Sequence, residues 1–154
     1  MKGILLCHQW KDNKNLVRRL FQEFWNGKNL AIADVIIAAS FLDHVPGRPP
    51  ELPAGPEGFK LWGSALHAAY PDTHYTIDDM LAEGDKVVSR WTAHGTHQGA
   101  LMGIAATGKH VTVTGITIDR IARDQVVESW TIFDALGMLQ QLGVVPLPEE
   151  HGKR

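Results

Sequence analysis

Three long segments of strand-forming residues follow one another between residues 86 and 134. They cover residues 86–97, 109–122 and 125–133, and all are rich in Val, Ile, Thr and Trp, which favour a pleated, half-buried strand. The last two are joined by so short a connection that we predict an antiparallel hairpin. A long curved sheet has to bury one face, so we expect helices on that face and a pocket in the gap.

The chain before residue 86 has a mostly helical pattern. Its first apolar stripe at helical spacing can be capped by Asp12 or Asn13 and ends at Gly27. The predicted fold class is α+β: a cone-shaped barrel in which a curved, mostly antiparallel sheet wraps on three N-terminal helices. Besides the three long strands, the predicted elements are helices at about residues 12–26, 30–39 and 56–70, strands at residues 41–44 and 75–82, and a short helix after Asp134.

The length of 154 residues suits one domain with its own core. We expect residues 1–11 to form a loose N-terminal extension, residues 12–145 a single domain, and residues 146–154 a charged tail. Residues 45–55 are rich in proline, which predicts an ordered loop that can act as a lid over the pocket mouth.

Charge and hydropathy exclude several classes of partner. The net charge is −2 and no long basic run occurs, so no nucleic-acid surface is expected. The lone Cys7 excludes an internal disulfide. No apolar run approaches the ~18 residues of a membrane span, and the one near the start is shorter than the ~7–15 residues of a secretion signal. We expect a soluble, cytoplasmic protein with no membrane partner.

Two motifs that resemble ligand sites fit structural roles better. Residues 103–109 match most of a phosphate-binding loop, but they join two strands, and His110 stands where a hydroxyl is needed. A glycine-rich connection is the better interpretation. His94 and His97 are three residues apart on a predicted strand, so their side chains point to opposite faces and cannot share one ion. We therefore expect no metal site.

Three polar residues stand at positions where they can act on a ligand. His44 follows an apolar strand, so its imidazole is either a satisfied structural group or a pocket-facing acid/base. Asp134 can cap the last helix, face the pocket, or do both. Arg90 lies in an apolar strand and either faces solvent or forms an internal ion pair with Asp134 or a substrate anion. The tryptophans are mostly core, although one or two, such as Trp62, can wall a pocket for flat ligands.

Short segments along most of the chain share a further pattern. They are NLVRRLF (15–21), FWNG (24–27), FLDH (41–44), PEGF (56–59), AEGDKVV (82–88), RWTA (90–93), GTH (95–97), TGK (107–109) and DALG (134–137). Together they resemble the SnoaL-like polyketide cyclases, also called ester cyclases, of the nuclear transport factor 2-like superfamily. The similarity extends over about residues 12–145. It indicates the fold more strongly than the activity, because the superfamily hosts cyclases, isomerases, hydrolases and binding domains.

The resemblance implies ring closure by an intramolecular aldol step on an aromatic polyketide methyl ester, with no metal or organic cofactor. In such cyclases an aspartate on the last long strand is the acid/base, and Thr131 occupies its place here. Ser129 and Thr117 stand where relatives carry histidines. A threonine hydroxyl is no base near neutral pH. The acid/base role therefore falls to His44 and Asp134, with His94 behind them.

Two functions remain open from the sequence. In the first, an enzyme with a relocated base acts on a hydrophobic carbonyl or ester compound. His44 takes the proton, Asp134 orients or shares it, and Thr131 and Thr117 hydrogen-bond the substrate oxygen. In the second, the chain binds a hydrophobic small molecule without chemistry. An epoxide hydrolase, which needs an Asp–Arg–Asp set around a water, and an isomerase of the same superfamily are further alternatives. For the hydrolase the candidate set is Arg90 with Asp134 and Asp119. The predicted substrate-binding residues are Trp62, Arg90, His94, Thr117, Ser129, Thr131 and Phe133.

The second long strand also predicts an oligomer. Ile116 and Ile118 alternate with Gly115, Thr117 and Asp119, so both faces of the sheet need partial cover. Relatives commonly pair through the outer sheet face, and we therefore expect a homodimer.

Overall fold

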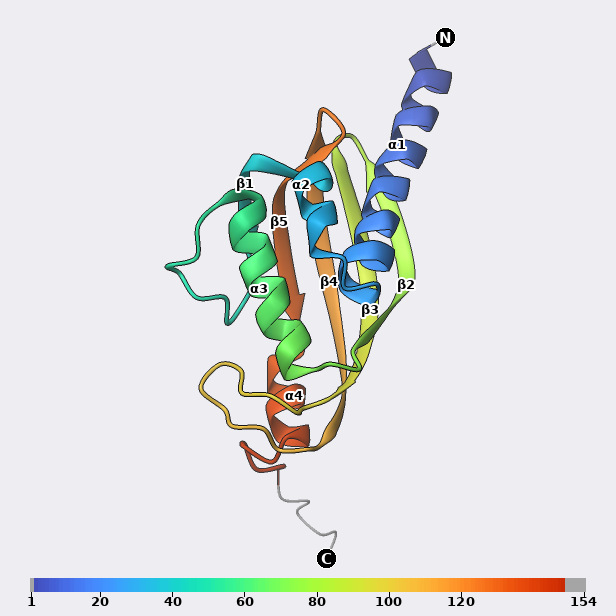
Figure 1. The fold of residues 1–154 in the computed structure, drawn as a ribbon. Helices are drawn as coiled ribbons and strands as arrows, with labels where there is room; N and C mark the ends of the chain where they lie inside the picture. The colour runs from blue at the N-terminus through green and yellow to red at the C-terminus, as the bar shows by residue number, and fades with distance from the viewer. Residues whose placement is uncertain (1, 149–154) are drawn as a thin grey trace, which may run out of the picture.

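The computed structural model describes residues 2–148 and confirms the α+β class, with helices on one face of a curved five-stranded sheet (Figure 1). The sheet order is β1-β5-β4-β3-β2, so β1 and β2 form open edges and the predicted cone does not close into a barrel. The strands are β1 (Ile37–His44), β2 (His74–Glu83), β3 (Lys86–Thr96), β4 (His110–Ala122) and β5 (Gln125–Phe133).

Neighbouring strands are antiparallel except for one pair. The edge strand β1 runs parallel to β5, with Asp43 opposite Ser129 and His44 opposite Trp130. The predicted hairpin between β4 and β5 is confirmed, and its two turn residues, Arg123 and Asp124, have φ angles of 52° and 58°. Positive φ at both positions is the geometry of the two-residue turn that matches the right-handed twist of paired strands.

Most helices precede the first strand, while one lies between β1 and β2 and another follows the last strand. The helices are α1 (Lys2–Arg19), its π-helical continuation η1 (Leu20–Asn26), the short η2 (Leu30–Ile32) and α2 (Ala33–Ile36), α3 (Gly55–Ala69) and α4 (Ala135–Gln141). Pro56 lies in the first turn of α3, as predicted.

Two predictions about the helices are wrong. The first helix begins at Lys2, so Asp12 and Asn13 lie inside it, and the predicted extension is helical where the structure describes it. No proline or glycine interrupts residues 4–19, and extending a nucleated helix is easy. The second helix ends at Ile36, because Ile37 pairs with Val126 of β5 and this tertiary pairing outweighs helix propensity. Most of the predicted charged tail, residues 149–154, lies outside the described residues.

Phe24 is the centre of the core between the helices and the sheet. It is fully buried, and its ring lies 4.8 Å from that of Trp25 and 4.5 Å from that of Phe59. Helix α3 approaches this ring through Gly63, where a Cβ atom would lie 2.4 Å from the Phe24 Cζ. The close contact fixes α3 over the sheet and so sets one wall of the space beneath it.

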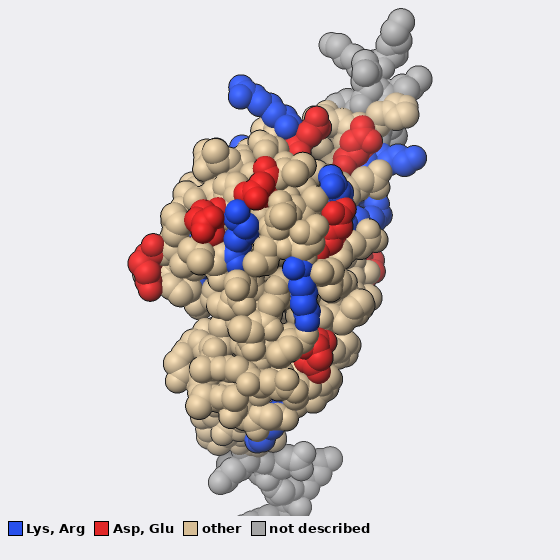
Figure 2. Space-filling view, in the orientation of Figure 1, with Lys and Arg blue, Asp and Glu red and all other residues tan. Residues whose placement is uncertain are grey.

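The surface is of mixed charge. Figure 2 shows Lys and Arg side chains interspersed with Asp and Glu on the viewed face, with few charges toward α4. Among the described helices, none combines the length and the apolar character that crossing a membrane requires.

The core arrangement predicts a large cost for Phe24→Ala. Removing a fully buried aromatic ring leaves a cavity and should lower the free energy of unfolding by about 3–5 kcal/mol. Leu61→Ala is the control, because Leu61 lies on α3 with 46% of its surface exposed, and its effect should stay within about 0.5 kcal/mol. Urea denaturation measures both. Equal losses in the two variants would contradict the assignment of Phe24 to the core.

Candidate functional site

A cavity of about 140 Å³ lies between the sheet and the helices. Its walls are mostly apolar and include eight Phe, Trp and Tyr side chains, which suits a flat, apolar ligand. Six of the predicted substrate-binding residues line it: Trp62, His94, Thr117, Ser129, Thr131 and Phe133. The main aromatic contributors are Phe21, Trp25, Phe59, Trp62, Tyr75 and Trp91.

Two rows of polar side chains cross β4 and β5 inside this cavity. The first row pairs Asp119 with Ser129, and the second pairs Thr117 with Thr131. Successive side chains of a strand alternate between faces, so residues two apart on both strands enter the cavity together. The polar atoms of an otherwise apolar site are therefore concentrated along these two strands.

Asp119 is the most deeply buried carboxyl group of the site. It is 2% exposed, and the Ser129 hydroxyl donates a hydrogen bond to its Oδ1. Burial raises the pKa of Asp119 to about 7, because a charged carboxylate is poorly solvated there. The Ser129 hydrogen bond opposes this rise, and the nearby Asp43 carboxyl adds to it. Asp119 can thus hold or release a proton near neutral pH.

Asp43 is the second carboxyl group of the cavity, and β1 delivers it. Its parallel pairing opposite Ser129 puts it in the same row as Asp119. Burial raises the pKa of Asp43 to about 6, while Arg48 and His44 partly offset that rise. The Arg48 guanidinium favours the ionised form of Asp43, whereas the deeper burial of Asp119 favours its neutral form.

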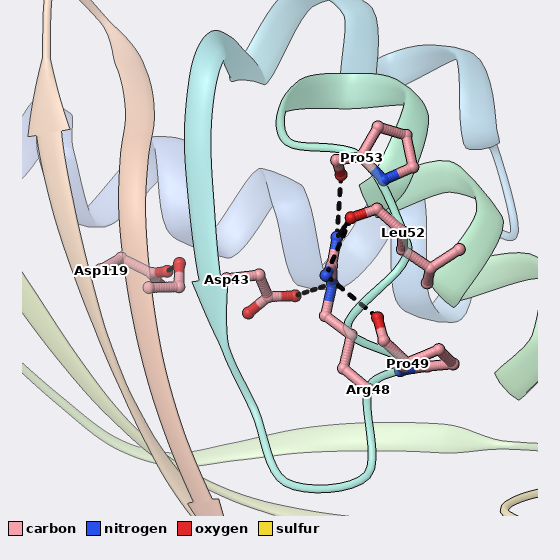
Figure 3. A network of polar contacts seen from close by, with 7 residues as sticks. Asp43, Arg48, Pro49, Leu52, Pro53 and Asp119 are labelled. Carbon is pink, nitrogen blue, oxygen red and sulfur yellow. Dashed lines mark hydrogen bonds and ion pairs between the residues drawn. The ribbon is translucent and has the colours of Figure 1, made fainter.

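Arg48 ties Asp43 to the proline-rich loop. Its Nε lies 3.8 Å from Asp43 Oδ2, and its guanidinium donates to the carbonyl oxygens of Pro49 (3.5 Å), Leu52 (3.4 Å) and Pro53 (2.9 Å) (Figure 3). As Figure 3 shows, the guanidinium lies between the loop backbone and the Asp43 carboxylate. One cation therefore holds the loop together and favours the ionised form of Asp43.

His44 does not line the cavity, contrary to the sequence-based expectation. The Asp43 side chain points inward, so the next residue on the strand points outward. The His44 ring stacks on Trp130 at 5.5 Å and its Nε2 lies 3.0 Å from Glu128 Oε1, with 48% of the side chain exposed. The prediction missed the inward-facing residue by one position.

Asp134 and Arg90 also lie outside the cavity wall. Asp134 caps α4, where the Gly137 N–H donates to its Oδ1 at 2.8 Å, and this confirms the capping role. Arg90 is half-exposed and bonds Asp79 Oδ2 at 2.6 Å, so the predicted partnership with Asp134 is wrong. The Arg90 side chain faces solvent, the other alternative that the sequence left open.

His94 contributes to the wall, but its ring is already engaged. Its Nδ1 lies 2.9 Å from the Thr112 hydroxyl, and its ring stacks on His110 at 6.2 Å. Sequence reasoning missed both carboxyl groups as candidates for the acid/base role. The alternation that joins Asp119 to Thr117 is a signal for Asp119. Asp43 had none, because its direction depends on the pairing of β1 with the distant β5.

The arrangement supports proton transfer more directly than any other chemistry. Two buried carboxyl groups with raised pKa values can exchange protons near neutral pH, and two hydroxyls can bond a ligand oxygen. Within residues 2–148, His, Cys, Asp and Glu side chains form no group of three or more that could hold a metal ion.

Comparison with known proteins gives consistent matches. The family model described as SnoaL-like polyketide cyclase matches residues 15–142. Aklanonic acid methyl ester cyclase DnrD of Streptomyces peucetius is 30% identical over 145 residues, covering 91% of this chain and 96% of the relative. Aklanonic acid methyl ester cyclase DauD of Streptomyces sp. (strain C5) is 29% identical over 141 residues, covering 91% of this chain and 86% of the relative. The structure of TsrD from Streptomyces laurentii superimposes with a TM-score of 0.79 at 27% identity, covering 88% of this chain and 97% of TsrD.

The raised pKa of Asp119 predicts a pH dependence of stability. Its folded-state pKa of about 7 lies above the ordinary value of 3.8, so between these values the unfolded chain loses a proton that the folded chain keeps. The free energy of unfolding should therefore fall as pH rises from 4 to 7, by at most about 1.4 kcal/mol per pH unit from this group. Asp119→Asn should remove that component in urea titrations across this range.

Asp124→Asn is the matched control, because Asp124 is exposed in the β4–β5 turn. It should leave the pH dependence as in the wild type. Parallel stability curves for wild type and Asp119→Asn would show that Asp119 is not a buried, neutral carboxyl group.

Proposed function

Because the chain belongs to the SnoaL-like polyketide cyclase family, we propose that it binds a hydrophobic carbonyl or ester compound and closes a ring in it by cofactor-free acid/base chemistry. The observation that carries this proposal is the presence of Asp43 and Asp119 together in the aromatic cavity. Both have raised pKa values, which suits groups that take up and return protons near neutral pH.

The two carboxyl groups divide the acid and base roles by their surroundings. Arg48 favours the ionised form of Asp43, which makes it the base, and the deeper burial of Asp119 favours its neutral form, which makes it the acid. These roles replace those expected for His44 and Asp134, since neither of these lines the cavity.

The proposed reaction is an intramolecular aldol step. The Asp43 carboxylate removes a proton from a carbon beside a carbonyl, and the C–H electron pair forms the C=C bond of an enolate. The enolate carbon attacks a second carbonyl carbon of the same molecule, which forms the new C–C bond and leaves an alkoxide. Asp119 gives its proton to this alkoxide. The product is an isomer of the substrate, and the proton gained by Asp43 restores Asp119.

A binding protein without activity is the second candidate function. Thr131 supports it, because the family resemblance puts an acid/base aspartate at this position. If the wild type binds but does not convert an aromatic polyketide methyl ester, and Thr131→Asp converts it, the chain is a binding domain. The Asp43, Arg48 and Asp119 set also keeps the epoxide hydrolase alternative open. Binding and conversion of a terpene epoxide and of a steroid enone should be measured beside those of the polyketide ester, to test the hydrolase and isomerase alternatives.

Turnover of aklanonic acid methyl ester tests the catalytic assignment, since two relatives carry that substrate in their names. Asp43→Asn and Asp119→Asn should each lower kcat by about 10²- to 10⁴-fold, the usual contribution of a positioned acid or base. Both variants keep the shape of the side chain, so ligand binding measured by tryptophan fluorescence should persist.

His44→Gln and Asp134→Asn are the controls and should keep kcat within about twofold, since neither side chain lines the cavity, and asparagine is also a good helix N-cap. Loss of turnover in His44→Gln with retention in Asp43→Asn would return the base to His44 and overturn the assignment.

We also propose that the protein is a homodimer formed through the outer face of the sheet. Large apolar side chains stand exposed on this face, including Leu42 (50%), Ile116 (47%) and Ile132 (71%). They lie on the neighbouring strands β1, β4 and β5, and an apolar patch of this kind is typical of an interface between copies.

Ile132→Lys should convert the homodimer to a monomer, because it puts a charge at the centre of the apolar patch. Light scattering after size exclusion measures the mass. Leu61→Lys is the control, because Leu61 is also exposed (46%) but lies on helix α3, away from the outer face of the sheet. A wild-type chain that elutes as a monomer would contradict the proposal.

A further inference from the structure

A chain of hydrogen bonds crosses three strands inside the cavity. The Trp91 Nε1–H on β3 donates to the Thr117 Oγ1 on β4 at 3.0 Å, and the Thr117 and Thr131 hydroxyl oxygens lie 2.9 Å apart. All three residues line the cavity. Polar groups that meet in a mostly apolar wall are positioned to fix the orientation of a ligand.

The indole of Trp91 is held firmly at the start of this chain. It is 7% exposed and packs edge to face with Tyr75, with ring centroids 5.3 Å apart. Its ring lies over Gly115 of β4, where a Cβ atom would come within 2.3 Å of Cζ2. Only glycine at this position leaves room for the ring, so residue 115 sets the place of the Nε1–H.

The number of hydroxyl hydrogens determines whether the Trp91–Thr117–Thr131 hydrogen bonds leave a free donor for a ligand. An indole nitrogen only donates, so Thr117 accepts from Trp91, and the bond between the two hydroxyls uses one of their two hydrogens. In either direction of that bond, one O–H hydrogen remains. Within residues 2–148 neither hydroxyl has another partner, and both border the cavity. The remaining hydrogen is therefore available to an acceptor in the cavity.

The hydroxyl pair lies beside the carboxyl groups at a useful spacing. Thr117 and Thr131 are each two residues from Asp119 and Ser129 along their strands, a separation of roughly 7 Å at ~3.4 Å per residue. One ketone can span this gap, with its oxygen at the hydroxyls and its adjacent carbon toward the carboxyl row.

We propose that the Thr117–Thr131 pair, held by Trp91, is the donor site for the substrate carbonyl oxygen that becomes the enolate oxygen. This inference rests on the proposed function and adds the orientation of the substrate. Thr131 or Thr117 touches the oxygen, and Trp91 is a positioning residue. The hydroxyl keeps its proton throughout. Its bond strengthens as negative charge develops on the oxygen, which lowers the barrier to proton removal.

Infrared spectroscopy of a bound ketone tests the assignment. The probe is 2-acetylnaphthalene with ¹³C at the carbonyl, because a hydrogen bond to the carbonyl oxygen lowers its stretching frequency. The C=O stretching frequency of the probe should be lower when it is bound to the wild type than when it is dissolved in a hydrocarbon solvent. The double variant Thr117→Val and Thr131→Val should raise the frequency and weaken binding about two- to tenfold, the range for one neutral hydrogen bond. Adding Trp91→Phe removes the last donor of this hydrogen-bonded chain and should move the frequency further toward the hydrocarbon value.

Several variants separate this role from a purely structural one. The double variant Thr117→Ser and Thr131→Ser keeps both hydroxyls and should restore the wild-type frequency. Trp91→Phe alone should raise it partly, because the hydroxyls lose the group that orients them. Thr114→Val is the matched control, because Thr114 lies on β4 but is exposed and outside the cavity wall. It should change nothing.

The outcomes distinguish this inference from the function on which it rests. If the probe binds and the double valine variant leaves the carbonyl frequency unchanged, the donor site is overturned and the cavity stands. If the carbonyl frequency instead rises in Asp119→Asn, Asp119 is the donor, and the assignment of the donor site to Thr117 and Thr131 is overturned. If the wild type binds neither this probe nor an aromatic polyketide ester, the proposed function fails, and the donor site fails with it.

Discussion

The parallel pairing of β1 with β5 determines which side chains enter the cavity. Asp43 stands opposite Ser129, so it points inward together with the residues of β4 and β5 that line the cavity. A shift of one residue would turn Asp43 to solvent and bring His44 inside, because side chains alternate along a strand. The polar character of the cavity therefore depends on the register of an edge strand that only eight residues form.

Burial is the second constraint, and it acts on both carboxyl groups. An aromatic wall suits a flat ligand, and it also raises the free energy of any charge inside it. Arg48 relieves that cost at Asp43, and the Ser129 hydroxyl relieves part of it at Asp119. Because the two groups have different partners, their surroundings favour different protonation states. Such a difference is what a paired acid and base require.

The polar rows also explain how the proposed acid/base site can lack an aspartate at position 131. The two rows are one pleat apart on the same strands, so a carboxyl group in the Asp119 row reaches the same cavity as one in the Thr131 row. Threonine at 131 supplies a donor where an ionised aspartate would supply acceptors. With threonine instead of aspartate at position 131, this row can donate a hydrogen bond to a carbonyl oxygen, and the carboxyl groups of the other row can accept a proton from the adjacent carbon.

Much of this architecture follows from the sequence alone. The alternation and composition of residues 86–134 predict the three central strands, because strand propensity and the short 122–125 connection act locally. Pro56 and Asp134 mark helix starts for equally local reasons, and the motifs at 41–44 and 134–137 point to the family. Six of the seven predicted substrate-binding residues line the cavity, since strand alternation and helical stripes carry that information.

Tertiary structure decided what local patterns do not contain. Ile37 leaves the helix for a strand because Val126, far along the chain, pairs with it. The same pairing makes Asp43 face inward and His44 outward. The local sequence does not show which of these two neighbouring residues faces the cavity. The pKa of Asp119 is raised because the cavity walls bury it and the Asp43 carboxyl lies nearby, while the Ser129 hydrogen bond opposes the rise. A pKa depends on surroundings, and long-range contacts supply the surroundings.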